Sequence, residues 1–270
     1  MPSRRSVLST CGLALAGLGG CVEGPTGGAE SDTVSPTPPP TATDSPVDVS
    51  TPRVRDAVVG HDSPDSMTAR DPEGWFVLAS VRANESDDQP QRAGAFSLAL
   101  DDRPVSAVDP RTLTRYRVDG FGTPYRRDDP DGWVAFEVSA EAGVSTAEVR
   151  VGPHRWPLPD SVVSRLNEPT PRWSLDVSFP DRLVTGERFE VTVTARNTST
   201  VPGTFCGALN VAELRYAYYP YPFAESAAPD ETATVTHSDS VPEGATHPSF
   251  YLRTQAGSES RSYEVRDSEQ

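Results

Sequence analysis

The chain has 270 residues, of which 24 are basic and 39 acidic, and its formal net charge is −15. Apart from the four histidines, every basic residue is an arginine, because the sequence has no lysine. Nucleic acid binding requires a basic surface that neutralises phosphates, so this acid excess excludes a nucleic acid partner. It equally disfavours adsorption on an anionic membrane surface.

The first twenty-one residues hold the most specific pattern in the chain. Arg4 and Arg5 precede an uncharged run over residues 6–20, which ends at Cys21. Paired arginines, a short apolar run and small residues before a cleavage point are typical of an export signal. A run of about fifteen residues is too short to span a hydrocarbon layer that needs roughly twenty. We therefore expect residues 1–20 to be a signal peptide that is removed.

Two short motifs in this segment resemble those of a known class. Residues 3–8, Ser-Arg-Arg-Ser-Val-Leu, resemble the twin-arginine export motif, and Leu18-Gly19-Gly20-Cys21 resembles the lipobox of prokaryotic lipoproteins. The resemblance implies export in the folded state and lipidation of Cys21. The membrane is then a partner through this lipid, which holds the protein at the extracellular face of the cell membrane. The alternative is an ordinary cleaved signal with Cys21 merely nearby.

The charge composition carries a second resemblance. An acidic chain without lysine resembles the proteins of salt-loving archaea. In molar salt the Debye length is about 3 Å, so self-repulsion at this net charge is largely screened. A lipoprotein from a bacterium of high GC content is the alternative source.

Residues 21–51 are mostly Gly, Ser, Thr, Pro, Asp and Glu. Such a segment has almost nothing to bury and cannot offset the entropy of folding. We predict a disordered stalk, stiffest at its proline-rich centre, that lifts the following domains away from the bilayer.

Periodicity after the stalk is that of strands, and it predicts an all-β fold with two immunoglobulin-like β-sandwiches. The first unit spans residues 52–167 and the second residues 172–268, with a proline-containing boundary between them. Alternating apolar runs bounded by Asp, Pro and Gly turns indicate short strands, and residues 160–167 are the one expected helix. About seven strands in the second unit suit an immunoglobulin-like sandwich.

One phrase occurs twice in the first unit. Residues 71–75, Asp-Pro-Glu-Gly-Trp, and residues 129–133, Asp-Pro-Asp-Gly-Trp, each open a strand. The pattern is typical of an acidic turn that delivers a tryptophan into a core. A calcium loop would need more oxygen ligands at alternate spacing.

Both units resemble known modules. Gly186-Glu187 through Asn197, followed by Pro229-Asp230-Glu231, resembles prokaryotic immunoglobulin-like modules related to adhesion. The first unit is similar to another immunoglobulin-like family of secreted and lipid-anchored prokaryotic proteins, over residues 74–84 and 133–138 with Trp156 near its end. These resemblances imply fold and setting, and they carry over no catalytic residue.

Motifs for chemistry are absent or weak. Cys206 has no histidine close behind it, so a type 1 copper site is excluded. A zinc site from Cys206, His237 and His247 is an alternative that their spacing does not favour. The sequence has no nucleophile elbow, zinc-protease helix or phosphate loop. We therefore predict no catalytic residue, no metal and no cofactor.

An aromatic run gives the candidate contact site. Residues 216–223 contain Tyr216, Tyr218, Tyr219, Tyr221 and Phe223, interrupted by prolines. Because proline is excluded from central strands, we place Tyr221 and Phe223 on a loop. Exposed tyrosines offer rigid, amphipathic contact area suited to a protein or glycan partner. The alternative is that they cover the open end of a sandwich.

Two sequons, at Asn84 and Asn197, are candidate glycosylation sites on an exported protein.

The leading expectation for the whole chain is a lipid-anchored surface protein that binds or adheres without catalysis. A small-ligand or ion-binding accessory lipoprotein is the first alternative, and a metal-dependent enzyme is the second.

Overall fold

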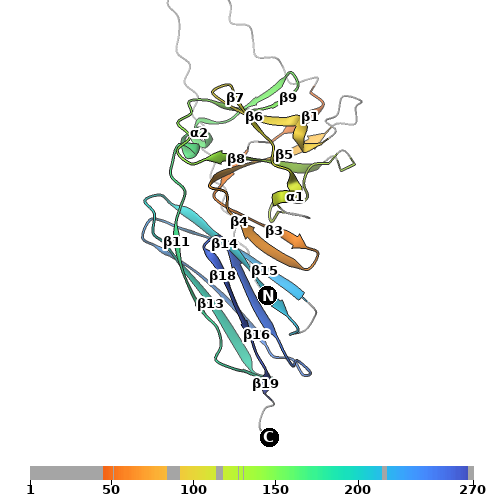
Figure 1. Ribbon diagram of the computed structural model, residues 1–270, viewed down its shortest axis with the longest axis vertical. Coiled ribbons are helices and arrows are strands. Elements are labelled where there is room, and N and C mark those ends of the chain that lie inside the picture. The colour runs from red at the N-terminus through yellow and green to blue at the C-terminus, as the bar shows by residue number, and fades with distance from the viewer. Residues whose placement is uncertain are drawn as a thin grey trace, which may run out of the picture. The chain divides into compact units, whose positions relative to one another are not determined.

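Antiparallel strands joined by short turns make up most of the chain (Figure 1), so the all-β prediction is confirmed. The computed structural model describes residues 45–50, 52–83, 92–113, 118–126, 128–129, 131–214 and 218–266. Contacts discussed below lie within residues 43–270, which form one unit. Among the described residues, no helix is long and apolar enough to cross a membrane.

Two antiparallel sheets build the first sandwich. One contains β1 (Val47–Val49), β2 (Arg53–Arg55), β5 (Gly74–Ala83) and β8 (Asp131–Ser139). The other has the order β10 (His154–Pro157), β9 (Ala147–Val151), β6 (Phe96–Leu100) and β7 (Arg103–Ser106). Since β8 pairs along one side of β5, β1 and β2 share its other side as one interrupted edge strand.

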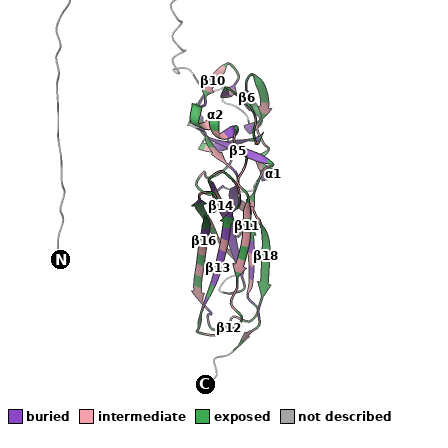
Figure 2. Ribbon diagram, turned by 90° about the vertical axis from the view of Figure 1, so that its left-hand side faces the viewer, coloured by how far each residue is buried: buried purple, intermediate pink, exposed green. Residues whose placement is uncertain are grey.

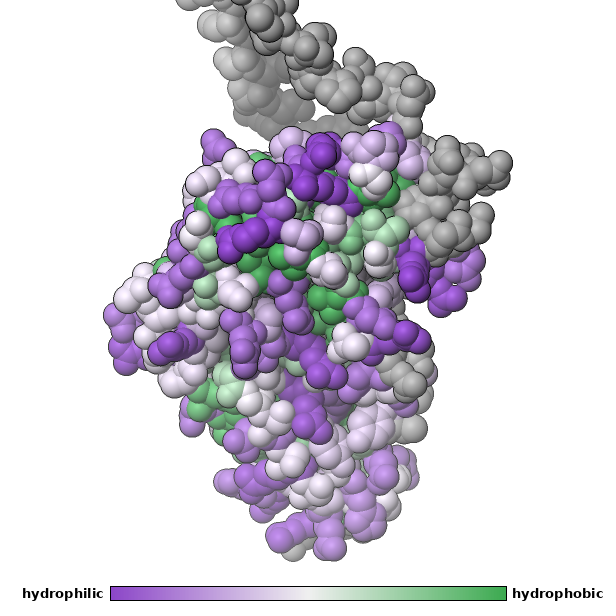
Figure 3. Space-filling model, turned by 45° about the horizontal axis from the view of Figure 1, so that its top comes forward, coloured by the Kyte–Doolittle hydropathy of each residue, from purple (hydrophilic) through white to green (hydrophobic). Residues whose placement is uncertain are grey.

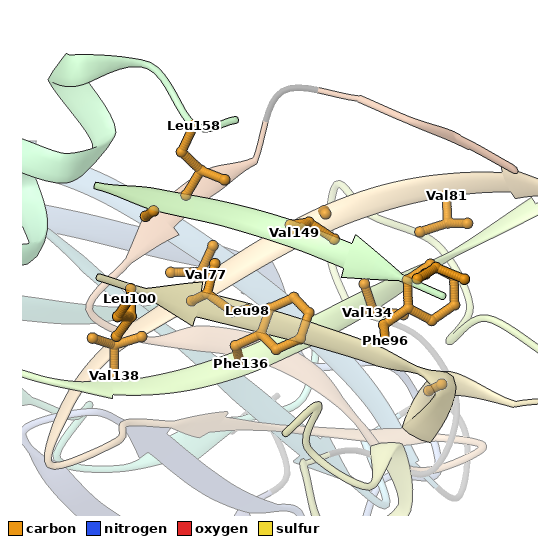
Figure 4. Close-up of a cluster of buried hydrophobic side chains, with 14 of the residues drawn as sticks. Val77, Val81, Phe96, Leu98, Leu100, Val134, Phe136, Val138, Val149 and Leu158 are labelled. Atoms are coloured by element: carbon orange, nitrogen blue, oxygen red, sulfur yellow. The ribbon is translucent and has the colours of Figure 1, made fainter. Parts of the chain in front are cut away.

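The core of this sandwich lies between the two sheets, where side chains such as Val77, Leu98, Phe136 and Val149 meet (Figure 4). Alternate residues of β5 face the opposite way. There Phe76 joins a second apolar cluster with residues of β8, the hairpin strand β3 (Val58–Ser63) and the short helix α1 (Pro110–Leu113). Strand β5 is therefore buried on both faces over residues 74–79, where its sequence is continuously apolar, and it alternates only near its end.

The repeated phrase opens β5 and β8, and its glycines are required by close packing. A Cβ atom on Gly74 would lie 2.1 Å from the carbonyl oxygen of Val138, and one on Gly132 would lie 2.4 Å from Cα of Tyr125. The tryptophans that follow are fully buried. Trp75 donates its indole N–H to the carbonyl of Glu168 at 3.1 Å, and Trp133 donates to the carbonyl of Gly122 at 3.0 Å.

The second sandwich repeats this architecture. Its first sheet has the order β11 (Trp173–Ser178), β13 (Arg188–Asn197) and β16 (Thr232–Ser240). Its second has the order β15 (Tyr218–Ala227), β14 (Gly203–Ala212), β17 (Ser249–Thr254) and β18 (Gly257–Ser262). The short strands β12 (Leu183–Val184) and β19 (Val265–Arg266) pair in parallel. Buried residues lie between the sheets (Figure 2).

Both sandwiches have the same connectivity when β1 and β2 are counted as one strand and the short pairs β3-β4 and β12-β19 are left out. In each, the first, second and fifth strands form one sheet, and the fourth, third, sixth and seventh strands form the other in that order. Antiparallel strands distributed over two sheets in this way give an immunoglobulin-like Greek key. The prediction of two immunoglobulin-like β-sandwiches is confirmed. Helix α2 (Asp160–Leu166) lies where the sequence predicts one.

Two features differ from the sequence prediction. Residues 47–49, which the sequence predicts to belong to the disordered stalk of residues 21–51, form strand β1, where Val47 is fully buried and pairs with Ala83. The first sandwich also has an insertion between its first two strands, the hairpin of β3 and β4 (Ser66–Arg70). Residues 1–44, where the sequence predicts the signal peptide and most of the stalk, lie outside the described residues.

We predict that Gly74→Ala lowers the free energy of unfolding by roughly 2–3 kcal/mol, because the added methyl group overlaps backbone atoms that cannot move independently. Gly94→Ala is the matched control, since the nearest atom to its Cβ would be 3.8 Å away. This control should change stability by less than about 0.5 kcal/mol. Urea denaturation measures both, and equal stability of the two variants would contradict the packing argument.

Candidate functional site

The predicted aromatic contact residues lie on a strand and not on a loop. Tyr218, Tyr219, Tyr221 and Phe223 belong to β15, while Tyr216 lies outside the described residues. The loop prediction for Tyr221 and Phe223 is therefore wrong. Strand β15 is the edge of its sheet, and an edge strand tolerates prolines because one side of its backbone has no partner strand.

Strand alternation sorts these aromatic residues into two sets. Tyr219, Tyr221 and Phe223 are half-buried and pack against the core of the second sandwich. Tyr218 faces the other way and, at 36% exposure, is the exposed large apolar side chain among the described residues. The predicted five-residue contact site is therefore not one surface.

The inward set closes the sandwich between β15 and β16. The ring of Tyr221 lies 3.8 Å from that of His237 on β16, and it meets the ring of Tyr219 edge-on at 5.1 Å. Burial lowers the pKa of His237, and the nearby Asp239 carboxylate opposes this effect. These residues therefore pack at the edge of the core of the second sandwich.

The outward-facing Tyr218 contacts a residue that the sequence analysis did not single out. Tyr218 stacks on Tyr251 of β17, with ring centroids 5.9 Å apart and an interplanar angle of 17°. Desolvation is the main cause that raises the pKa of Tyr218, and a hydrogen bond with Tyr251 adds to it. We call these two side chains the tyrosine pair. The outward position of Tyr251 could have been read from its place between the core residues Phe250 and Leu252.

Charged groups flank the tyrosine pair. The carboxylate of Asp65 raises the pKa of Tyr218 further, whereas the guanidinium of Arg253 lowers it. Asp65 lies between β3 and β4, and β4 contacts both β14 and β15. The site therefore combines two stacked aromatic rings with their phenol hydroxyls and charges of both signs. Such a combination can contact a protein or a glycan.

The sequon at Asn197 has a structural role. Asn197 is fully buried, and its Nδ2 donates to the carbonyls of Val201 and Ala227 at 2.9 and 3.1 Å. Its Oδ1 accepts from the backbone N–H of Ser199 at 3.0 Å and from the Ser199 hydroxyl at 2.6 Å. An amide with all these bonds inside the folded protein is not accessible to sugar transfer, so we expect a structural role for Asn197 in place of glycosylation. Asn84 lies outside the described residues.

We predict that Asn197→Ala lowers the free energy of unfolding by roughly 2–3 kcal/mol, because it leaves several buried backbone groups unpaired. Ser174→Ala, at an exposed position of β11, is the control and should have little effect. Peptide mass spectrometry of the native protein should find Asn197 unmodified. A glycan on the Asn197 peptide would contradict this role.

The three residues of the zinc alternative do not come together. Cys206 lies in a small apolar cluster and donates its thiol to Oε1 of Gln255 at 3.0 Å. Burial raises the pKa of this thiol to about 12. His237 packs beside Tyr221, and His247 is exposed. Within the described ranges, no group of three His, Cys, Asp or Glu side chains could hold a metal ion.

The first sandwich has a pocket large enough for a small molecule. A cavity of about 900 Å³ is lined by apolar residues including Ala93, Val108 and Tyr125, with arginine and aspartate side chains also present. Arg111 and Asp109 pair there at 2.7 Å, so their charges are partly neutralised. The size suits a small ligand. On the face shown in Figure 3, hydrophilic side chains predominate and apolar ones form smaller areas between them.

Arg4, Arg5 and Cys21 lie outside the described residues, so the structure says nothing of the export motif or the lipidation site.

Comparisons with known proteins give no identity. No family model matches the sequence, and no curated protein gives a significant match. A β-glucosidase from Listeria innocua in complex with isofagomine is similar at a TM-score of 0.31 and 17% identity, over 38% of this chain and 18% of that one. A CARDB domain from Pyrococcus furiosus is similar at a TM-score of 0.31 and 12% identity, over 36% of this chain and 96% of that one. Likenesses this weak carry no argument about function.

Proposed function

We propose that this protein is a lipid-anchored surface protein that binds a partner protein or glycan without catalysis. The tyrosine pair is the observation that carries the proposal. In this reading Arg4 and Arg5 direct export, Cys21 carries the lipid and the stalk holds the sandwiches away from the bilayer.

The physical argument rests on how the tyrosine pair is held. Tyr218 and Tyr251 project from neighbours of the same central strand, β14, and each ring limits the motion of the other. Binding of a partner costs these two tyrosines little side-chain entropy, because tyrosine has few rotatable bonds. Each ring also offers apolar area together with a hydroxyl that forms hydrogen bonds. Tyrosine is accordingly enriched among the residues that dominate binding energy at interfaces.

The test is crosslinking on intact cells that carry the full chain. We predict that the double variant Tyr218→Ser, Tyr251→Ser reduces the yield of the crosslinked partner at least tenfold, because each truncated anchor costs about 1–2 kcal/mol of binding energy. The control is Ser260→Ala, at the residue of β18 that pairs with Tyr251. Urea denaturation of both variants establishes that they are folded.

Capture that is equal in the double variant and in the wild type would remove the tyrosine pair as the contact site. Substitution of Tyr219, Tyr221 and Phe223 is unsuitable for this test. These side chains pack against the core, so their loss would lower stability as well as any binding.

A small-ligand-binding accessory protein is the second candidate, and the cavity of about 900 Å³ favours it. Its lining mixes apolar residues with arginine and aspartate side chains, which could orient a small polar ligand. Native mass spectrometry of the purified protein separates the two candidates, since a bound small molecule adds a discrete mass and a surface contact does not.

A further inference from the structure

The hairpin of β3 and β4 is an addition to the sandwich that carries it. In the second sandwich the corresponding connection, between β11 and β13, contains only the two-residue strand β12. Both sandwiches nonetheless have the same strand order, so the hairpin is not needed to form the sheets. It packs instead on strands β14, β15 and β17 of the second sandwich (Figure 1).

Apolar contact covers one face of β14. Ala57, Val59 and Met67 from the hairpin region form a buried cluster with Cys206 and Ala208. The opposite face of β14 already belongs to the core of the second sandwich, through residues such as Leu209. The hairpin therefore buries the second face of β14 as well. In a sandwich without such an addition, the outward face of a strand is exposed to solvent.

A side chain supplies the first polar anchor. The Asn210 carboxamide accepts from the backbone N–H of Met67 at 2.8 Å and donates to the carbonyl of the same residue at 2.9 Å. It thereby satisfies both backbone groups of Met67, as a neighbouring strand would. Asn210 is only 3% exposed, and Nδ2 also lies 3.3 Å from the carbonyl of Tyr251. A buried amide with these bonds is costly to leave unpaired, so it fixes the position of the hairpin.

The second polar anchor is the hydrogen-bonded pair of side chains Gln255 and Asp56, at the base of the hairpin. Gln255, in the turn between β17 and β18, donates from Nε2 to the Asp56 carboxylate at 3.0 Å. Its Oε1 accepts from the backbone N–H of Cys206 at 2.8 Å and from the thiol of the same residue. Asp56 precedes the hairpin and is almost fully buried. Gln255 thus bonds to both sandwiches at once.

We propose that the outer face of β14, with the adjoining parts of β15 and β17, is a docking surface whose occupant is the β3–β4 hairpin of the same chain. The tyrosine pair lies beside this surface, where Tyr218 remains 36% exposed. Docking joins the two sandwiches into one cooperatively unfolding unit, with Asn210 and Gln255 as its polar anchors. The inference goes beyond the proposed binding function and does not depend on a partner being found.

Hydrogen exchange of the full chain, followed by mass spectrometry along a urea series, tests the docking surface. In the wild type, peptides from β8 and from β13 should lose protection at the same urea concentration. In Asn210→Ala, exchange of the Met67 amide in the absence of urea should accelerate by about 10- to 100-fold, because its acceptor is lost and the hairpin opens locally. Peptides from β8 and β13 should then lose protection at different urea concentrations.

The controls keep the proposal falsifiable. Ser178→Ala, exposed on β11, should leave exchange of the Met67 amide unchanged. If Asn210→Ala does not fold, Gln255→Ala replaces it, because Gln255 is only half-buried. Exchange of the Cys206 amide, which donates to Gln255, should then accelerate by about 3- to 10-fold. Two separate unfolding steps in the wild type, or unchanged exchange in a folded variant, would overturn the proposal.

Discussion

Two hydrogen bonds between the Asn210 carboxamide and the backbone of Met67 are the interaction on which the arrangement of the described chain depends most. They join residues that are 143 positions apart, next to a small apolar contact between the hairpin and β14. Without them, β14 would expose its outer face and the hairpin would have two unpaired backbone groups. The hydrogen bonds of Gln255 to Asp56 and to the backbone of Cys206 stabilise the same contact at the base of the hairpin.

This contact also bears on the proposed function. The twin-arginine route implied by the sequence exports proteins that have already folded, so a single cooperative unit would suit it better than two loosely joined sandwiches. The hairpin further brings Asp65 close enough to Tyr218 to influence its pKa. The tyrosine pair, on the second sandwich, therefore has a neighbour contributed by the first. In the proposed reading a rigid aromatic surface is presented at the end of an extended, lipid-anchored stalk.

Sequence reasoning predicted the features that depend on local pattern. Alternating runs such as residues 189–195, turn residues and the short helix before the proline boundary gave the all-β class and the two sandwiches. It failed where burial depends on distant residues. Val47 is in a strand only because β5 offers it an edge, and Tyr221 is inward only because β16 brings His237 beside it. A sequon gives no sign that Asn197 is buried, and nothing near Met67 indicates that Asn210 is its partner.

The central claim is that a folded two-sandwich protein is anchored outside the cell through Cys21. Intact mass spectrometry of the native protein, extracted from fractionated cells, tests this claim most directly. The account predicts a membrane-associated chain that begins at Cys21 and carries the additional mass of a lipid. A chain that retains Met1, lacks any acyl or isoprenoid mass and fractionates with the cytosol would contradict it.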